Sequence, residues 1–175
     1  MMKTAIIYVS QTGFTKQYAE WLAEEVGGGC MPFAEAEKKD FSEYDAIVFG
    51  SWCHAGMIRK LGWFKERLSQ WQDKKKVVFA VGASPLENPE LEDGLRRNFT
   101  DEEWAQISVF YCPGGLRYDA MKPVSKVMMK MFAKMMENKK DKTEDEKVMA
   151  EMIGKSYDIS DRKYIQPIVG CLKAK

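Results

Sequence analysis

Cysteine pairs, histidine clusters and long apolar runs are missing from this chain of 175 residues. The four cysteines form no Cys-x-x-Cys pair and there is one histidine, which argues against a zinc or iron–sulfur site. We therefore expect no metal and interpret the cysteines as reduced thiols. No apolar run approaches the ~20 residues of a membrane-spanning helix, and the first residues lack the cleavage region of a signal peptide. These absences predict a cytoplasmic protein.

The common nucleotide-binding motifs are missing as well. The chain has neither the Gly-x-x-x-x-Gly-Lys of P-loop proteins nor the Gly-x-Gly-x-x-Gly of dinucleotide-binding proteins. The net charge is +1, and we expect no nucleic-acid partner. The charge is unevenly spread, because basic side chains outnumber acidic ones between positions 117 and 140. The acidic residues there are Asp119 and Glu137, and the basic ones are Arg117, Lys122, Lys126, Lys130, Lys134, Lys139 and Lys140.

Apolar strands alternate with helical segments along the chain, which is the pattern of βαβ units. The expected strands lie near 3–9, 30–34, 46–50, 77–82 and 107–111. The expected helices lie near 14–26, 57–71, 89–98, 121–138 and 148–154. A short helix should follow the capping box of Thr100 and Glu103. A last helix should begin at about 160, and Pro167 could kink it. The pattern predicts one α/β domain over 1–175, with a doubly wound five-stranded parallel sheet in the order 2-1-3-4-5, helices on both faces and an extra basic, methionine-rich helix at 121–138.

A hydroxyl-rich turn joins the first strand to the first helix. At a helix N-terminus the first N–H groups have no partner and the helix dipole favours an anion, so a phosphate suits this turn. The hydroxyls would bind it, and a glycine lets the backbone approach closely. An ordinary capped turn is the plain alternative. The predicted phosphate-binding residues are Ser10, Gln11, Thr12, Gly13, Phe14 and Thr15.

The pattern Ser-x-Thr-Gly-x-Thr after a first strand resembles the phosphate loop of the flavodoxin family, which binds FMN. The resemblance covers nearly the whole chain and implies FMN as the cofactor. It also implies that the loops after the third and fourth strands contact the flavin ring, since ligands of such sheets bind beyond the carboxyl ends of the strands.

The turn after the third strand would frame the flavin ring. An aromatic wall could come from Trp52 or His54, although Trp52 could instead anchor the core and His54 could be a plain surface histidine. Cys53 is either a redox thiol or a buried bystander. The predicted ring contacts are Ser51, Trp52, Cys53, His54, Ala55 and Gly56, with Gly82, Ala83 and Ser84 bordering the other edge of the ring.

The second half of the chain resembles one branch of the family, the flavodoxin-like, quinone-dependent protoporphyrinogen oxidases. The matching element is Gly114-Gly115-Leu116-Arg117-Tyr118, followed by an inserted basic helix. The ring turn departs from that branch, because it carries Trp-Cys-His where aliphatic and tyrosine residues are expected. Arg117 could hold a substrate carboxylate or form an ion pair, for instance with Asp119.

The inserted helix carries an apolar stripe and a row of lysines four residues apart. One interpretation packs the stripe on the sheet and leaves the lysines solvated. The other makes this helix a surface for an apolar partner or an anionic membrane, which would place the protein at the membrane periphery.

The sequence therefore predicts an FMN-binding flavodoxin-like redox protein, active in electron transfer or as a flavin-dependent oxidoreductase. Its electron partner would be a redox protein or a quinone. The first alternative is an enzyme like the quinone-dependent protoporphyrinogen oxidases. An alternative of another class is a non-catalytic interaction module of the same fold without flavin.

Overall fold

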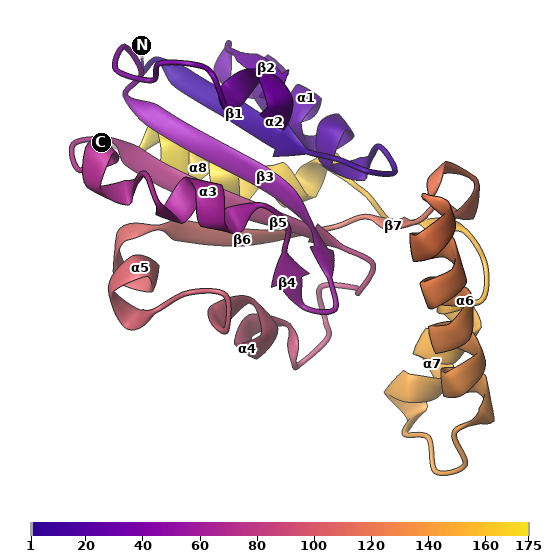
Figure 1. Ribbon diagram of the computed structural model, residues 1–175. Coiled ribbons are helices and arrows are strands. Elements are labelled where there is room, and N and C mark those ends of the chain that lie inside the picture. Colours follow the sequence, from indigo (N-terminus) through magenta and orange to yellow (C-terminus); the bar gives the residue numbers. More distant parts are fainter. Residues whose placement is uncertain (1, 175) are drawn as a thin grey trace.

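A five-stranded parallel sheet forms the centre of the molecule in the computed structural model, which describes residues 2–174 (Figure 1). The strand order is β2-β1-β3-β5-β6, and a short β4 pairs antiparallel with the end of β3. This confirms the predicted order 2-1-3-4-5, with β5 and β6 as the fourth and fifth parallel strands. The strands are β1 (Thr4–Val9), β2 (Gly29–Pro32), β3 (Ala46–His54), β4 (Met57–Ile58), β5 (Lys75–Gly82) and β6 (Ser108–Pro113).

Helices cover both faces of the sheet, as the doubly wound pattern requires (Figure 1). Successive residues of a strand point to opposite faces, so Ile6 and Val48 pack against α1 (Phe14–Val26) and α8 (Gln166–Lys173). Their neighbours pack on the other face against α2 (Phe33–Ala36), α3 (Leu61–Lys65) and the 3-10 turn η1 (Leu68–Trp71). Because both faces are buried, the strands read as continuous apolar runs.

Two predictions of helix geometry were wrong. The segment 57–71, expected as one helix, is divided into β4, α3 and η1. The apolar side chains spaced three to four apart are buried as expected, but Lys60 has a positive φ of 60° that no continuing helix accommodates. The last helix is not kinked, since Pro167 lies in the first turn of α8, where proline costs no hydrogen bond.

Capping residues set the limits of three helices. Gly27 ends α1 in the left-handed conformation. The predicted box of Thr100 and Glu103 is present at the start of α5 (Asp101–Gln106), after α4 (Leu91–Arg96). A second box, of Thr143 and Glu146, starts α7 (Glu144–Ile153) four residues before the predicted beginning, because the mixed-charge segment 144–147 forms its first turn.

The inserted segment forms a helical hairpin of α6 (Pro123–Asn138) and α7 that stands beside the sheet, at the end where the parallel strands finish (Figure 1). A two-stranded ribbon of β7 (Gly115–Leu116) and β8 (Tyr157–Asp158) forms its base, flanked by the 3-10 turn η2 (Tyr118–Ala120), and the turn η3 (Arg162–Ile165) then leads to α8. The helical hairpin has a small core of its own around Leu116, Tyr118, Met136 and Ile153. Among residues 2–174, no helix is both long and apolar enough to cross a bilayer.

Candidate functional site

The carboxyl ends of β1, β3 and β5 lie side by side at one edge of the sheet. Val9 is in register with Ser51, and Trp52 is in register with Val81. The three predicted loops therefore begin at the same level, on adjacent strands. From β1 the chain continues outward to β2, and from β3 it continues outward in the other direction to β5. Parallel sheets of this kind bind ligands at the carboxyl ends of the two strands where the direction changes.

The predicted phosphate loop, residues 10–13, is an open helix N-terminus. Gly13 is the N-cap of α1 with a φ of 96°, and no side chain caps the helix. The Ser10 hydroxyl accepts a hydrogen bond from the Gly13 N–H at 3.2 Å, so its own proton stays free to be donated. Thr15 and Phe14 are buried, while Ser10, Gln11 and Thr12 are partly exposed. An uncapped first turn with nearby hydroxyl donors fits an anionic group.

Arg117 brings a positive charge to this loop from a point more than a hundred residues further along the chain. Its Nη1 donates to the Thr12 carbonyl at 3.2 Å, and its guanidinium stacks 3.9 Å from the Phe14 ring centre. Its Nη2 donates to Gln17 at 3.3 Å and pairs with Asp158 at 2.9 Å. A side chain at Gly13 would place its Cβ only 3.0 Å from Nη1. Arg117 thus places a cation beside a loop that itself contains no lysine or arginine, and it pairs with Asp158 rather than with Asp119.

The predicted ring turn is a β-hairpin, here called the ring hairpin (residues 51–58). Strand β3 continues to His54, so Trp52, Cys53 and His54 lie on a strand rather than in a loop, contrary to the prediction. The turn itself has only two residues, Ala55 and Gly56, with φ of 48° and 79°. Two positive φ angles make the twisted two-residue turn that suits adjacent antiparallel strands.

Alternation along β3 separates the predicted ring contacts. The Trp52 and His54 rings lie on one side, 5.9 Å apart and inclined by 81°, with the Arg59 guanidinium 5.8 Å from the Trp52 ring. Ser51 is fully buried, and its hydroxyl donates to the Arg59 carbonyl at 2.6 Å. Burial raises the pKa of the Cys53 thiol to about 12, so this thiol is protonated and unreactive at neutral pH.

Asn98 holds the ring hairpin in place. Its side chain is buried, accepts from the Ile58 N–H at 2.9 Å and donates to the Gly56 carbonyl at 2.9 Å. It thereby ties both sides of the turn to the end of α4. The sequence carries no signal for this role beyond an asparagine at a helix end, so sequence reasoning misses it.

The third predicted loop, Gly82 to Ser84, is fastened by two tyrosines. Tyr111 donates to the Ser84 carbonyl at 2.8 Å, and Tyr157 donates to the Ala83 carbonyl at 2.6 Å. A Cβ at Gly82 would meet the Tyr111 hydroxyl at 2.6 Å, so only glycine fits there. Because Tyr157 belongs to β8, the base of the helical hairpin helps to shape this side of the site.

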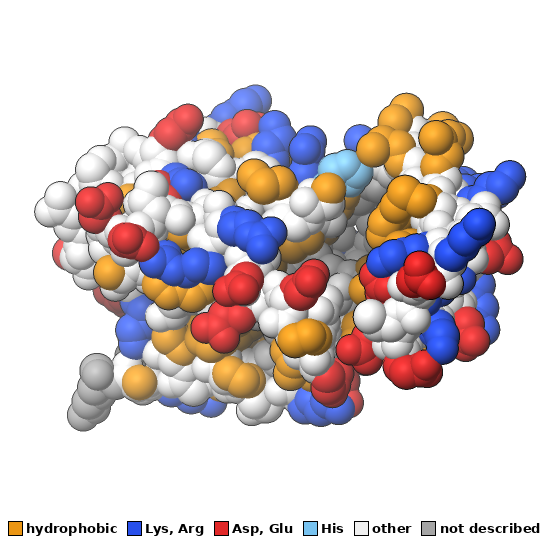
Figure 2. Space-filling model, turned by 90° about the horizontal axis from the view of Figure 1, so that it is seen from below, with side chains coloured by type: hydrophobic (Ala, Val, Ile, Leu, Met, Phe, Trp, Pro, Cys, Tyr) orange, Lys and Arg blue, Asp and Glu red, His pale blue; other side chains and the backbone are white. Residues whose placement is uncertain are grey.

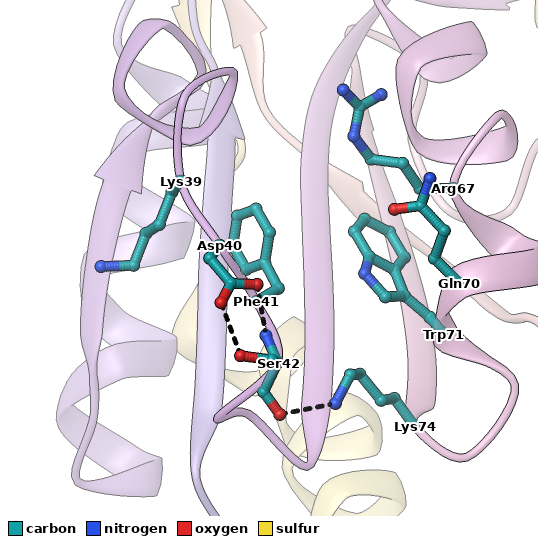
Figure 3. Close-up of a pocket in the computed structure, with 8 residues that line it drawn as sticks. All are labelled: Lys39, Asp40, Phe41, Ser42, Arg67, Gln70, Trp71 and Lys74. Carbon is teal, nitrogen blue, oxygen red and sulfur yellow. Dashed lines mark hydrogen bonds between the residues drawn. The ribbon is translucent and has the colours of Figure 1, made fainter.

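The space-filling view shows a hollow between the sheet and the helical hairpin (Figure 2). The single histidine, His54, lies on its margin, opposite apolar side chains of the helical hairpin. A cavity of about 170 Å³ lies elsewhere, between the segment 39–42 and the residues around η1 (Figure 3). That cavity adjoins the amino ends of β3 and β5, so it is remote from the predicted loops. Within residues 2–174, no group of His, Cys, Asp and Glu side chains could hold a metal ion.

Comparison with known proteins gives one family and several similar structures. The model of the Flavodoxin domain family matches residues 5–143. Among curated proteins, no sequence matches significantly. Similar solved structures include a protein described as a flavoprotein from Bacteroides uniformis, with 20% identity over 74% of this chain and 98% of that chain and a TM-score of 0.46.

Two further solved structures are similar to this chain. A flavoprotein in complex with FMN from Lactobacillus acidophilus is 18% identical over 65% of this chain and 93% of that chain, with a TM-score of 0.42. A flavodoxin-type, WrbA-like protein from Agrobacterium tumefaciens is 24% identical over 49% of this chain, with a TM-score of 0.41. This chain spans 63% of the length of the Agrobacterium protein.

Proposed function

This chain belongs to the flavodoxin domain family, and on that premise we propose that it is an FMN-binding redox protein. The observation that carries the proposal is the open N-terminus of α1, where hydroxyl donors, free backbone N–H groups and the Arg117 guanidinium converge around residues 10–13. A dianionic phosphate is the ligand that such a set of donors favours.

Each part of the phosphate site has a separate task in this proposal. The first-turn N–H groups of α1 and the hydroxyls of Ser10 and Thr12 donate to the phosphate oxygens. Arg117 holds the Thr12 carbonyl and adds a positive charge beside the loop. Phe14 gives the guanidinium an aromatic face that keeps it in position.

Trp52 and His54 would hold the flavin ring. Since their rings are inclined by 81°, a flat ring stacked on one of them would lie nearly perpendicular to the other. Ala55 and Gly56 leave the backbone of the turn exposed beside that position. The fastened carbonyls of Ala83 and Ser84 would border the opposite edge of the ring. The bound flavin accepts and releases electrons, and the protein positions it and limits its contact with water.

The position of the helical hairpin helps to choose between the possible redox roles. It stands beside the carboxyl ends of the parallel strands, and Tyr157 at its base fastens Ala83. We therefore favour electron exchange with a partner that approaches on this side, either a redox protein or a quinone. An activity like that of the quinone-dependent protoporphyrinogen oxidases stays a prediction. An assay of quinone reduction with protoporphyrinogen as the electron donor would test it.

Cofactor affinity tests the proposal directly. Calorimetry on apoprotein should show tight FMN binding and weak riboflavin binding, because riboflavin lacks the phosphate. Thr12→Ala removes one donor to a charged group, worth about 1.5–3 kcal/mol, so FMN affinity should fall roughly ten- to hundredfold. Equal affinity for riboflavin and FMN would contradict the proposal.

The ring position has its own test. FMN should quench tryptophan fluorescence of the apoprotein, and the quenching should be smaller in Trp52→Leu. Trp104→Leu, on the distant helix α5, is the matched control. An unchanged flavin spectrum and affinity in both Trp52→Leu and His54→Ala would place the ring elsewhere.

A further inference from the structure

Helix α6 exposes its most apolar side to solvent. We call this side the apolar face of α6, and its six side chains are between 39% and 72% exposed: Val124, Val127, Met128, Met131, Phe132 and Met135. The opposite side, with Met129, Ala133 and Met136, packs against α7. Of the two interpretations of this stripe, the one that packs it on the sheet is therefore wrong. Exposed apolar patches of this kind on a folded protein mark contact surfaces.

A row of lysines runs beside the apolar face. Lys126, Lys130 and Lys134 recur every four residues, which places them along one flank of the helix, and Lys122 precedes them at its N-cap. Among residues 2–174, none of the four forms a salt bridge. The helix itself carries one acidic side chain, Glu137. The flank therefore presents unneutralised positive charge.

We propose that the apolar face of α6 docks on the surface of an anionic phospholipid membrane. An interfacial helix buries its apolar side among the acyl chains while lysines on the adjacent flank meet the headgroups. Methionine suits this contact, because its flexible side chain adapts to an irregular apolar environment. A second copy of this chain is a poorer occupant, since an antiparallel two-fold contact through this face would bring the two lysine rows together.

The docking is separate from the proposed redox function, and the two are linked through one feature of the structure, the hollow beside His54. Apolar side chains of the helical hairpin reach the hollow beside His54 (Figure 2). A docked helical hairpin would thus bring the ring site close to the lipid, where apolar quinones dissolve. This last link rests on the proposed function, whereas the docking itself depends only on α6.

Vesicle sedimentation tests the docking without any flavin. Apoprotein and FMN-loaded protein should both sediment at low salt with vesicles made of equal parts phosphatidylglycerol and phosphatidylcholine, and not with pure phosphatidylcholine. Binding should weaken at physiological salt, where the Debye length is about 8 Å. Failure of FMN binding leaves this assay unaffected, so the two proposals can fail separately.

Matched variants separate charge from apolar contact. The triple change Lys126→Gln, Lys130→Gln and Lys134→Gln should lower the vesicle partition coefficient about a hundredfold, while Lys38→Gln, Lys39→Gln and Lys173→Gln, which remove the same charge elsewhere, should leave it nearly unchanged. Val127→Ser with Met131→Ser should lower it about tenfold. Both side chains are exposed, so circular dichroism should stay unchanged.

Three results would overturn the docking. One is the absence of sedimentation with anionic vesicles at low salt. Another is an equal loss of binding in the two lysine triples, which would reduce the effect to net charge. The third is a concentration-dependent dimer in analytical ultracentrifugation that Val127→Ser with Met131→Ser abolishes, which would assign the apolar face of α6 to a second copy of the chain.

Discussion

The sheet and the helical hairpin place similar apolar side chains in opposite environments. In the sheet, Ile6, Val48 and Phe49 are fully buried. In α6, Val124 and Met131 are 72% and 67% exposed, although they too recur with the period of one face of their element. Both regions therefore carry a regular apolar pattern, and only one of them buries it.

The difference comes from the number of packing partners. The sheet is covered on two faces by helices, so every apolar position on its central strands finds a neighbour. Helix α6 has one main partner, the ten-residue α7, which covers one side only. A regular apolar stripe thus indicates a contact surface, and the tertiary structure decides whether the contact is made within the chain.

Truncating one apolar side chain in each region should give the largest contrast. Phe49→Ala leaves a cavity in the core and should lower the free energy of unfolding by about 3–5 kcal/mol. Met131→Ala removes an exposed side chain and should change it by no more than about 0.5 kcal/mol. Urea unfolding of the two apoproteins measures both values. A large loss in Met131→Ala would mean that α6 packs more closely in solution than the structure shows.

Arg117 joins the two regions, so its replacement should affect the phosphate loop. Arg117→Gln loses the charge and the fork that holds the Thr12 carbonyl, which should reduce FMN affinity by about 1.5–3 kcal/mol, measured by calorimetry. Riboflavin affinity should change little. The control is Arg162→Gln, which removes an arginine paired with Glu24 away from the loop. Equal losses for FMN and riboflavin would make Arg117 a general support of the fold.

Removing the Tyr118 hydroxyl should loosen the helical hairpin alone. This buried group donates to the Ile153 carbonyl at 2.5 Å, and Tyr118→Phe leaves that carbonyl without its partner, at a cost of about 1–3 kcal/mol. Amide hydrogen exchange should accelerate in α7 and stay unchanged in β5. Acceleration in both elements would show that the helical hairpin and the sheet unfold as one unit.

The smallest contrast comes from two equivalent helix caps. Thr100→Ala and Thr143→Ala each destroy a capping box and should each cost about 1 kcal/mol. Thr100 starts a helix packed near the sheet, so its loss should lower the urea midpoint of the whole protein. Thr143 starts α7, and its loss should appear as faster amide exchange at 144–147 with an unchanged midpoint. A lower urea midpoint in Thr143→Ala with an unchanged midpoint in Thr100→Ala would contradict this prediction.

Much of the fold follows from local patterns in the sequence. Continuous apolar runs predicted the buried parallel strands, because strands buried on both faces have no polar alternation. The alternation of these strands with helices predicted their order. The helix at 57–71 was predicted wrongly, since its apolar spacing is shared by a hairpin strand, a short helix and a 3-10 turn. In this segment the helical spacing indicated the buried side chains, but it did not exclude a break such as the one at Lys60.

The candidate site was predicted in part by the same means. A hydroxyl-rich turn between strand and helix has a local signal, because the unpaired N–H groups of a helix start belong to neighbouring residues. Arg117 and Asn98 have no such signal for their roles, since their partners lie elsewhere in the chain. The ring contacts predicted for Trp52 and His54 stay a prediction, and their place on a strand came from the pairing of β3 with β4.

The sequence by itself determined the parallel α/β architecture, the hydroxyl-rich turn before α1 and the apolar and basic stripes of α6. Each depends on residues close together in the chain, so hydrogen bonding and side-chain periodicity suffice to predict it. Only the tertiary structure decided that Arg117 reaches Thr12, that Asn98 holds the ring hairpin, and that α6 turns its apolar face outward. These outcomes depend on which distant surfaces compete for contact, and that competition is settled by packing of the whole chain.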